Sequence, residues 1–105
     1  MTPEEYIAAM HDGLYLEKGT ELTACMRPMA REAQKITAEI NGAYHTPEEQ
    51  RALMSELTGK PVDEGFALFP PIYTDCGRNL TIGKNVFINS GCCFQDQGGV
   101  AIGDG

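Results

Sequence analysis

The stretch LTIGKNVFINSGCCFQDQGGVAIGDG, residues 80–105, repeats a simple pattern every six residues. The first position of each repeat holds a large apolar side chain: Ile82, Ile88, Phe94 and Val100. Four residues after each of the first three stands a small or compact side chain: Val86, Cys92 and Gly98. This spacing is typical of parallel β-helix coils, in which short strands point large side chains inward and small residues fit the corners. An alternating β-hairpin does not explain a period of six.

The length of one coil follows from two counts along the same stretch. Three repeats, from Ile82 to Val100, make up one triangular coil with Ile82, Ile88 and Phe94 facing its interior. The Ile-Gly pairs at 82–83 and 102–103 are 20 residues apart, two more than three repeats need. We therefore predict a two-residue bulge near residues 97–99.

Composition limits the class of protein and the kinds of partner. The chain has 105 residues, of which 42% are hydrophobic, so it is long enough for one small folded domain. Its formal net charge of −7 argues against a nucleic-acid surface and against a basic patch for membranes. No apolar run reaches the length of a signal sequence or a membrane span, so we expect a cytoplasmic protein.

The cysteines argue against a metal site and against disulfides. The four of them are not spaced as Cys-x-x-Cys, which makes a zinc site improbable, and we expect free thiols. Adjacent residues of a strand project to opposite sides. We therefore predict that Cys92 is buried and that Cys93 is accessible.

The part of the chain before the repeats predicts helices. Residues 2–5 and 46–49 both read TPEE, a capping box with proline at the first helical position. Between them, apolar residues recur every three to four positions up to Asn41-Gly42, with Pro28 inside the pattern. We predict a helical cap region over 1–62, a connector over 63–71, and a β-helix section over 72–105.

The motifs of the second half resemble a known family. Residues 70–77 (PPIYTDCG), residues 79–89 (NLTIGKNVFIN), Asp96, and residues 102–104 (IGD) are similar to the maltose and galactoside O-acetyltransferases, which are hexapeptide-repeat acyltransferases. The resemblance covers nearly the whole chain and about the first half of a typical member. It implies an α+β fold, with a short N-terminal helical region followed by the first coil of a left-handed parallel β-helix.

The resemblance also implies a reaction, the transfer of an acetyl group from acetyl-CoA to a sugar hydroxyl, in a homotrimer. Proton removal from a hydroxyl calls for a base that titrates near neutrality, usually a histidine. The family's catalytic histidine lies downstream of residues 102–104, and its coenzyme A contacts come from later coils. His11 and His45 do not match it and are expected to be surface residues. We therefore expect the 105-residue chain to be inactive by itself.

Asn89 is the candidate catalytic residue among those present. It matches the family's asparagine in a Phe/Tyr-x-Asn step, which implies a role in the acceptor site and in stabilising the developing oxyanion. A side-chain amide N–H aimed at that oxygen is a suitable donor. The structural alternative is a turn residue, because asparagine tolerates left-handed backbone at corners.

Four further residues are candidates for the sugar site on the same resemblance, and a fifth is aligned more loosely. Asp75 and Asp96 match positions where the family places polar contacts to the sugar, and Gln97 stands where the galactoside enzyme has a second acidic residue. Phe87 can form a platform for a sugar ring, and Glu17 is the nearest equivalent of an acidic contact near the end of the first helix. The alternatives are that Asp96 caps the bulge and that Phe87 packs outward.

Two other functions remain open from the sequence. The first is a non-catalytic oligomerisation or sugar-binding module, and the second is a helical adaptor that ends in a β-hairpin. Self-association is expected in either of the β-helix interpretations, because one coil buries little surface and leaves strand edges open.

Overall fold

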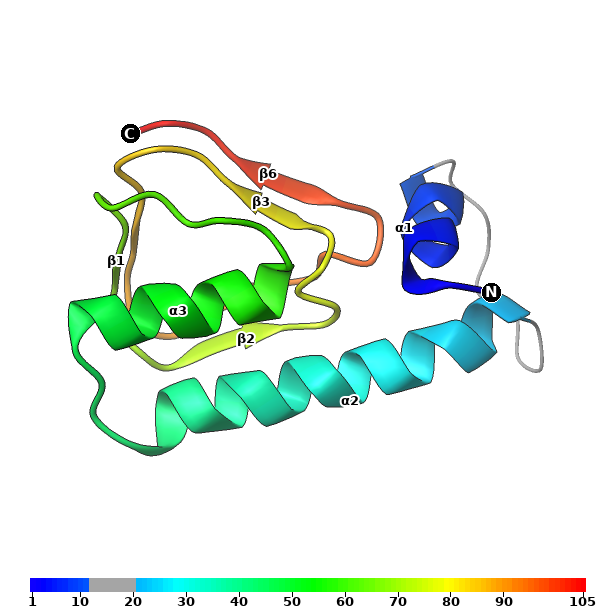
Figure 1. Ribbon diagram of the computed structural model, residues 1–105, viewed down its shortest axis with the longest axis horizontal. Coiled ribbons are helices and arrows are strands. Elements are labelled where there is room, and N and C mark those ends of the chain that lie inside the picture. Colours follow the sequence, from blue (N-terminus) through cyan, green and yellow to red (C-terminus); the bar gives the residue numbers. More distant parts are fainter. Residues whose placement is uncertain (12–20) are drawn as a thin grey trace.

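The computed structural model describes residues 1–11 and 21–105, which form three helices followed by six short strands (Figure 1). The helices are α1 (Pro3–His11), α2 (Glu21–Gly42) and α3 (Pro47–Thr58). The strands are β1 (Ala67–Leu68), β2 (Ile72–Thr74), β3 (Leu80–Ile82), β4 (Phe87–Ile88), β5 (Cys92–Phe94) and β6 (Val100–Ile102). Helices therefore precede strands along the chain, as the α+β interpretation predicts.

Both predicted capping boxes are present. At α1, the Glu5 backbone N–H donates to Thr2 Oγ1 and the Thr2 N–H donates to the Glu5 carboxylate, each over 3.1 Å. At α3, Thr46 and Glu49 make the same reciprocal pair over 3.2 and 2.8 Å. These bonds satisfy N–H groups that have no partner inside the helix, so each TPEE run begins a helix.

The six strands form three two-stranded sheets, and each pair is parallel. β1 pairs with β4, β2 with β5, and β3 with β6. The partners are 20 residues apart in all three sheets, as Leu68 with Ile88 and Ile82 with Ile102 illustrate. Parallel pairing excludes the hairpin, whose strands run antiparallel. The arrangement is consistent with part of a parallel β-helix.

The strand section contains nearly two turns, one more than the first coil alone. We call β1, β2 and β3 the lower level, and β4, β5 and β6, each of which pairs with one of them, the upper level. β1 lies within the predicted connector over 63–71. Its two residues do not complete a six-residue repeat, so the sequence pattern does not show the strand, and only its pairing with β4 does.

The predicted inward positions are confirmed. Ile88 is buried, and Ile82 and Phe94 are partly buried against the same core. Their alternate neighbours Thr81 and Cys93 are exposed, as expected of a period of two along a strand. Cys92 is only half-buried, which corrects the prediction of a buried thiol, because it belongs to the upper level and no described strand lies above it.

The predicted bulge is confirmed near residues 97–99, and an equivalent one exists in the lower level. The extra residues lie between β5 and β6, and again between β2 and β3. The Asp75 N–H donates to the Phe94 carbonyl over 3.1 Å, and the Val100 N–H donates to the Asn79 carbonyl over 3.0 Å. We call this stack of residues 75–79 and 95–99 the widened corner. Residues 89–91, between β4 and β5, form the tight corner.

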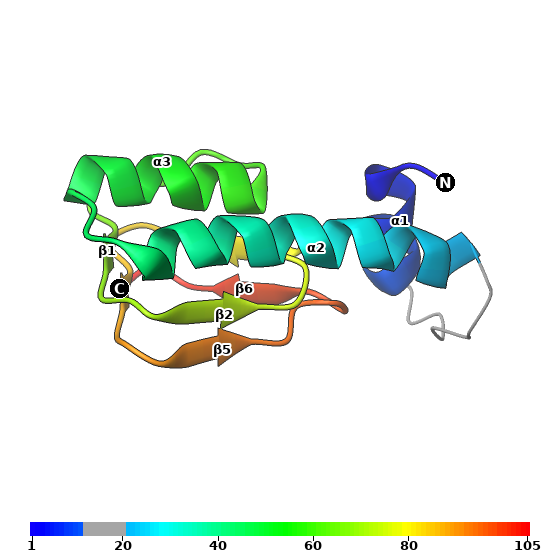
Figure 2. The same cartoon turned by 90° about the horizontal axis from the view of Figure 1, so that it is seen from below.

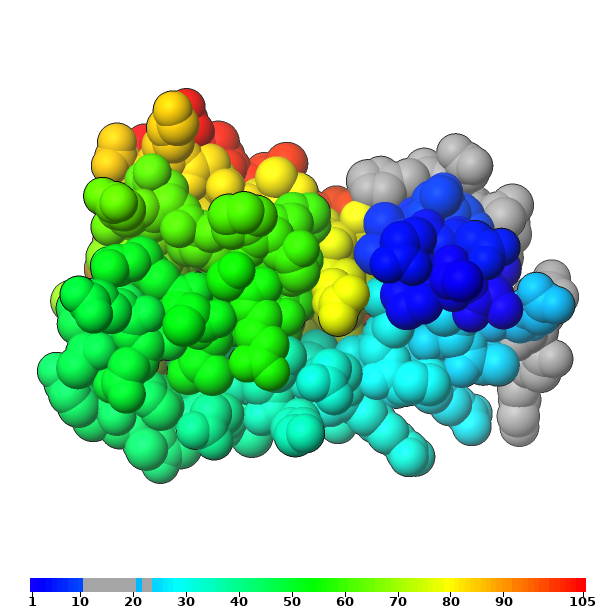
Figure 3. Space-filling model, in the orientation of Figure 1, coloured from blue at the N-terminus to red at the C-terminus, as the bar shows by residue number. Residues whose placement is uncertain are grey.

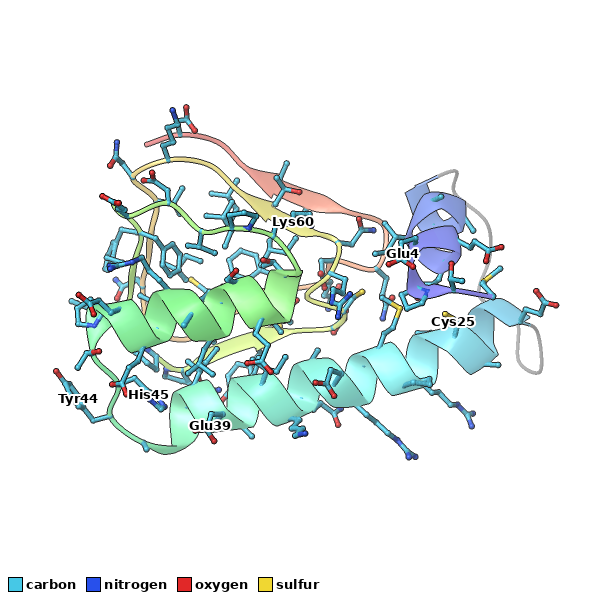
Figure 4. The ribbon with its side chains drawn as sticks, viewed as in Figure 1. Glu4, Cys25, Glu39, Tyr44, His45 and Lys60 are labelled. Carbon is cyan, nitrogen blue, oxygen red and sulfur yellow. The ribbon has the colours of Figure 1, made fainter. Side chains whose placement is uncertain are left out.

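The helices cover the lower level of strands. α2 lies beside β2, and β5 lies on the side of β2 that faces away from α2 (Figure 2). The Asn41 side chain, near the end of α2, exchanges two hydrogen bonds of 2.9 Å with the backbone of Ile72. Lys60 lies beside β3, where its ammonium donates to the carbonyls of Arg78 and Leu80 over 2.8 and 3.0 Å (Figure 4). The lower strand edges are therefore satisfied by side chains from the helical region.

Two apolar clusters hold the parts together. The larger joins α2, α3 and the strands and includes Ile40, Met54, Leu57, Ile72, Leu80 and Ile88. The smaller lies under α1 and consists of Tyr6, Met29 and Cys76, with Ile7, Met10, Cys25 and Met26 packed against it. In the space-filling view α1 lies at one end of the molecule, against the start of α2 (Figure 3). α1 is therefore attached through its own small core.

Two findings bear on the compositional predictions. The cysteines Cys25, Cys76, Cys92 and Cys93 are all free. Among the described helices, none combines the length and the apolar character that a membrane crossing requires.

Candidate functional site

Asp96 is the buried polar centre of the widened corner. Its side chain is 0% exposed. One carboxylate oxygen, Oδ1, accepts hydrogen bonds from the Thr74 hydroxyl over 2.7 Å and from the Cys76 backbone N–H over 2.8 Å. The other oxygen, Oδ2, is buried without a hydrogen-bond partner among the described residues. Buried carboxylate oxygens are normally satisfied, so Oδ2 is an acceptor that is open to a ligand donor.

Gln97, the next residue, is held at both its side chain and its backbone. The Tyr6 hydroxyl, from α1, donates to Gln97 Oε1. The Asn79 side chain, from the lower level of the corner, donates to the Gln97 carbonyl over 3.1 Å. Tyr6 is itself 0% exposed. Among the described residues, the Tyr6–Gln97 contact beside Asp96 is the one hydrogen bond that ties the first helix to the widened corner.

The electrostatics of the corner favour uncharged partners around Asp96. Burial, followed by the neighbouring Cys76 and Cys25 and by the carboxylates of Asp96 and Asp75, raises the pKa of Tyr6 to about 12. Burial and then the charge of Asp96 raise the pKa of the Cys76 thiol. Both groups are therefore protonated near neutral pH, and the Tyr6 hydroxyl acts as a donor.

Lys60 is a positive charge whose pKa responds to Asp96. Burial lowers the pKa of Lys60, and the charge of Asp96 opposes that effect. Its ammonium is nevertheless bonded to the backbone carbonyls of Leu80, in β3, and Arg78, two residues earlier, and to no carboxylate among the described residues. Asp96 therefore keeps one oxygen free for a neutral donor such as a hydroxyl group.

Asn89 and Phe87 lie at the other end of β5 from Asp96. Asn89 precedes β5 at the tight corner and is exposed, and its Oδ1 accepts from the Ser90 N–H over 2.8 Å. Phe87, on β4, is 52% exposed and packs edge-on against Phe69, with ring centroids 5.0 Å apart. The left-handed backbone weighed as the alternative for Asn89 is not found there, because among the described residues other than glycine only Asn85 has a positive φ, of 55°. The bond to Ser90 leaves the side-chain N–H₂ of Asn89 available for a ligand.

The structure brings together three of the predicted site residues and separates the others. Asp75, Asp96 and Gln97 share the widened corner, with Asp75 exposed on the lower level. Asn89 and Phe87 do not join them within one chain. Glu17 lies outside the described residues. These placements leave the predicted roles of the residues untested.

Two further observations concern other possible sites, one at His45 and one on metal binding. His45 lies at the turn before α3, where a ring nitrogen is 2.8 Å from the Glu39 carbonyl oxygen, and neighbouring Tyr44 points outward (Figure 4). In the parts of the chain that the structure describes, no group of three or more His, Cys, Asp and Glu side chains could hold a metal ion. The widened corner remains the candidate site.

Sequence reasoning missed the partners of the predicted residues. Tyr6 reads as one member of a helical apolar stripe, and nothing in its surroundings signals a contact with Gln97, 91 positions later. Thr74 and Cys76 lie in a motif that the resemblance covers, but their bonds to Asp96 depend on the stacking of two levels. Only the 20-residue spacing of the Ile-Gly pairs hints at that stacking.

A cavity lies below the corner, between α1 and α2. Its volume is about 200 Å³, and its lining includes Pro3, Met29, Ala33, Cys76 and Arg78. Cys76 is the link between this cavity and the buried carboxylate, since its backbone N–H is bonded to Asp96. The space beside the corner is therefore bounded by α1 on one side.

Comparisons with known proteins point to acetyltransferases. No family model matches the chain. A Staphylococcus haemolyticus protein named "Putative acetyltransferase" is 46% identical over 65 residues, which cover 61% of this chain and 33% of that protein. The bifunctional protein GlmU of Bordetella parapertussis is 35% identical over 69 residues, covering 66% of this chain and 15% of that one.

Solved structures agree with the fold. A hexapeptide-repeat containing acetyltransferase from Vibrio cholerae superposes with a TM-score of 0.68 and 28% identity, over 75% of this chain and 44% of that one. Its complex with acetyl coenzyme A superposes with a TM-score of 0.67 and 24% identity, over 98% and 52%. The matches support the broad group of hexapeptide-repeat acetyltransferases. They do not single out the maltose and galactoside O-acetyltransferases.

The extent of the matches limits what they say. The chain spans about a third of the length of the Staphylococcus haemolyticus relative and about half of the Vibrio cholerae structures. The left-handed parallel β-helix of such acetyltransferases is consistent with three helices followed by stacked parallel strands.

Proposed function

We propose that this chain is part of an acetyl-CoA-dependent O-acetyltransferase that acts on a sugar hydroxyl. The observation that carries the proposal is the free, buried Oδ2 of Asp96 in a fold shared with a hexapeptide-repeat acetyltransferase that binds acetyl coenzyme A. A carboxylate with one oxygen held and the other free is suited to accept a hydrogen bond from a sugar hydroxyl. Asp75 and Gln97 place further polar groups in the same corner.

The chemistry joins the sugar oxygen to the acetyl carbon. The hydroxyl oxygen attacks the thioester carbonyl, the carbon–sulfur bond breaks, the sugar proton passes to a base, and coenzyme A leaves as its thiol. Asp96 orients the sugar through a hydroxyl that does not react. Asn89 supplies a side-chain N–H to the carbonyl oxygen as negative charge develops on it. The resemblance assigns the base to a histidine outside residues 1–105.

We extend the proposal to a homotrimer. Asn89 and Asp96 lie at opposite ends of β5 and belong to different corners of the triangular coil. An extended strand between them keeps them apart within one chain. Both can act on the same sugar if the tight corner of one copy lies against the widened corner of the next, and three copies close such a ring.

A non-catalytic sugar-binding or oligomerisation module is the second candidate. It is favoured by the bond between Asn89 Oδ1 and the Ser90 N–H, which is sufficient to explain an asparagine at this corner. Both candidates allow sugar binding and self-association, and they differ in whether acetyl transfer takes place.

The test measures binding and turnover separately. Two proteins are compared: the 105-residue chain, and the protein translated from the whole reading frame that contains it. Each is incubated with acetyl-CoA and with maltose, methyl galactosides or methyl glucosides, and the release of the coenzyme A thiol is followed. We expect sugar-dependent release from the gene product, with a loss of about 10²-fold or more on Asn89→Ala. Sugar binding without any thiol release would favour the non-catalytic module, and the absence of both would refute the proposal.

A further inference from the structure

Helix α1 closes over the corner that contains Asp96. Tyr6 and Asp96 are each 0% exposed, and Cys76 between them is 2% exposed. Tyr6, Cys76 and Met29 form the small cluster that attaches α1 to the rest of the chain. The free Oδ2 of Asp96 is therefore inaccessible to a ligand while α1 stays in this position.

In the part of the chain that the structure describes, one hydrogen bond joins α1 to the corner. The Tyr6 hydroxyl donates to Gln97 Oε1, and Gln97 is fixed from below by Asn79. Because the pKa of Tyr6 is raised to about 12, the phenol keeps its proton and the bond persists at neutral pH. The rest of the cluster is largely apolar, and its Cys25 thiol lies 3.7 Å from the Thr2 carbonyl oxygen, which fixes the start of α1 to α2 and not to the corner. The Tyr6–Gln97 bond is therefore the described polar contact that directs α1 toward the corner.

We propose that the Tyr6–Gln97 hydrogen bond holds α1 closed over Asp96, and that a hydroxyl-bearing acceptor reaches Asp96 Oδ2 only when this bond opens. Tyr6 and Gln97 are then positioning residues that control access to the acceptor site. The identity of the ligand as a sugar rests on the proposed function. The closure of α1 by this bond does not.

A closed state of α1 weakens the apparent affinity for the acceptor. If only the open fraction of molecules binds, the measured dissociation constant exceeds the intrinsic one by the inverse of that fraction. Removing the Tyr6–Gln97 bond raises the open fraction. The same change should therefore expose Cys76 and tighten sugar binding by one common factor.

The first experiment measures opening through Cys76 in the 105-residue chain. Labelling by an alkylating reagent at fixed pH is followed by mass mapping for the wild type, Tyr6→Phe, Gln97→Met and the double variant. Loss of one hydrogen bond should speed labelling of Cys76 by roughly twofold to tenfold. The double variant should label no faster than either single variant, because both remove the same bond.

Two controls accompany this measurement. Tyr73→Phe, on the exposed face of β2, should leave the rate at Cys76 unchanged, and the exposed Cys93 should label at one rate in every variant. An unchanged rate at Cys76 in both Tyr6→Phe and Gln97→Met would overturn the proposal. An acceleration at Cys92, which packs against the larger core and not under α1, equal to that at Cys76 would overturn it too, because the bond would then stabilise the whole fold.

The second experiment measures binding of maltose and methyl β-galactoside by NMR titration of the same variants. Tyr6→Phe should lower the dissociation constant by the factor seen at Cys76. Weaker binding by Tyr6→Phe would refute the gating role. Faster labelling with no sugar binding by any variant would leave the closure of α1 established and reject the sugar, which separates this inference from the proposed function.

Discussion

The two ends of β5 differ more than their common strand suggests. The tight corner before the strand is short and exposed, and its asparagine bonds to the next residue. The widened corner after the strand buries a carboxylate, stacks two levels of backbone and is covered by a helix from the N-terminus. Two extra residues per level create the space in which Asp96 turns inward. The difference shows that a local insertion provides room for a site, while a distant helix determines its access.

The largest expected effect on stability concerns one glycine in each of the two corners. Gly77, in the widened corner, has φ of 76°, and a Cβ there would lie 2.7 Å from both the carbonyl oxygen and a side-chain carbon of Leu57. Gly91, in the tight corner, has φ of 84° and open space around it. Gly77→Ala should cost about 3 kcal/mol from strain plus steric conflict. Gly91→Ala should cost about 1 kcal/mol from strain.

Urea unfolding followed by circular dichroism measures both glycine variants. Equal costs for the two would show that α3, which contains Leu57, does not press on the widened corner as the structure has it.

The next effect concerns the buried carboxylate. Asp96→Ala removes the acceptor for the Thr74 hydroxyl and the Cys76 N–H, and relieves the unpaired Oδ2 at the same time. We expect a net loss of about 2 kcal/mol in the free energy of unfolding. Asp96→Asn is the matched control, because its amide oxygen can still accept both bonds, and it should retain most of the stability.

A smaller effect is expected at alkaline pH. The pKa of Tyr6 is about 12 in the folded chain and about 10 in the unfolded chain. The folded state therefore holds its proton where the unfolded state has lost it, and stability is full below pH 10 and falls as pH rises toward 12. Tyr6→Phe should flatten the unfolding free energy over this window. The exposed Tyr73→Phe serves as control, and an identical pH profile for both variants would contradict the burial of Tyr6.

The smallest effect on stability is expected at the tight corner. Asn89→Ala removes one exposed hydrogen bond and should change the unfolding free energy by less than about 0.5 kcal/mol. Thermal unfolding of this variant beside Asp96→Ala would sharpen the contrast between the two ends of β5. A loss as large as that of Asp96→Ala would mean that the tight corner also depends on buried contacts.

Much of the chain could be predicted from patterns that are local. The two TPEE runs predict where α1 and α3 begin, because a capping box is complete within four residues. The inward positions Ile82, Ile88 and Phe94 follow from spacing alone, because the coil repeats its geometry every six residues. The bulge follows from the two Ile-Gly pairs, whose separation counts the residues in a turn.

The tertiary structure decided what the sequence left open. β1 becomes a strand only through its pairing with β4, and Cys92 stays half-buried because nothing described stacks above it. Asp96 was predicted as a candidate, yet its two bonds and its free oxygen depend on the level below. The contact between Tyr6 and Gln97 spans 91 positions. Local patterns carry no record of such a pair, because it forms only when the packing of α1 and the stacking of the coils bring its two members together.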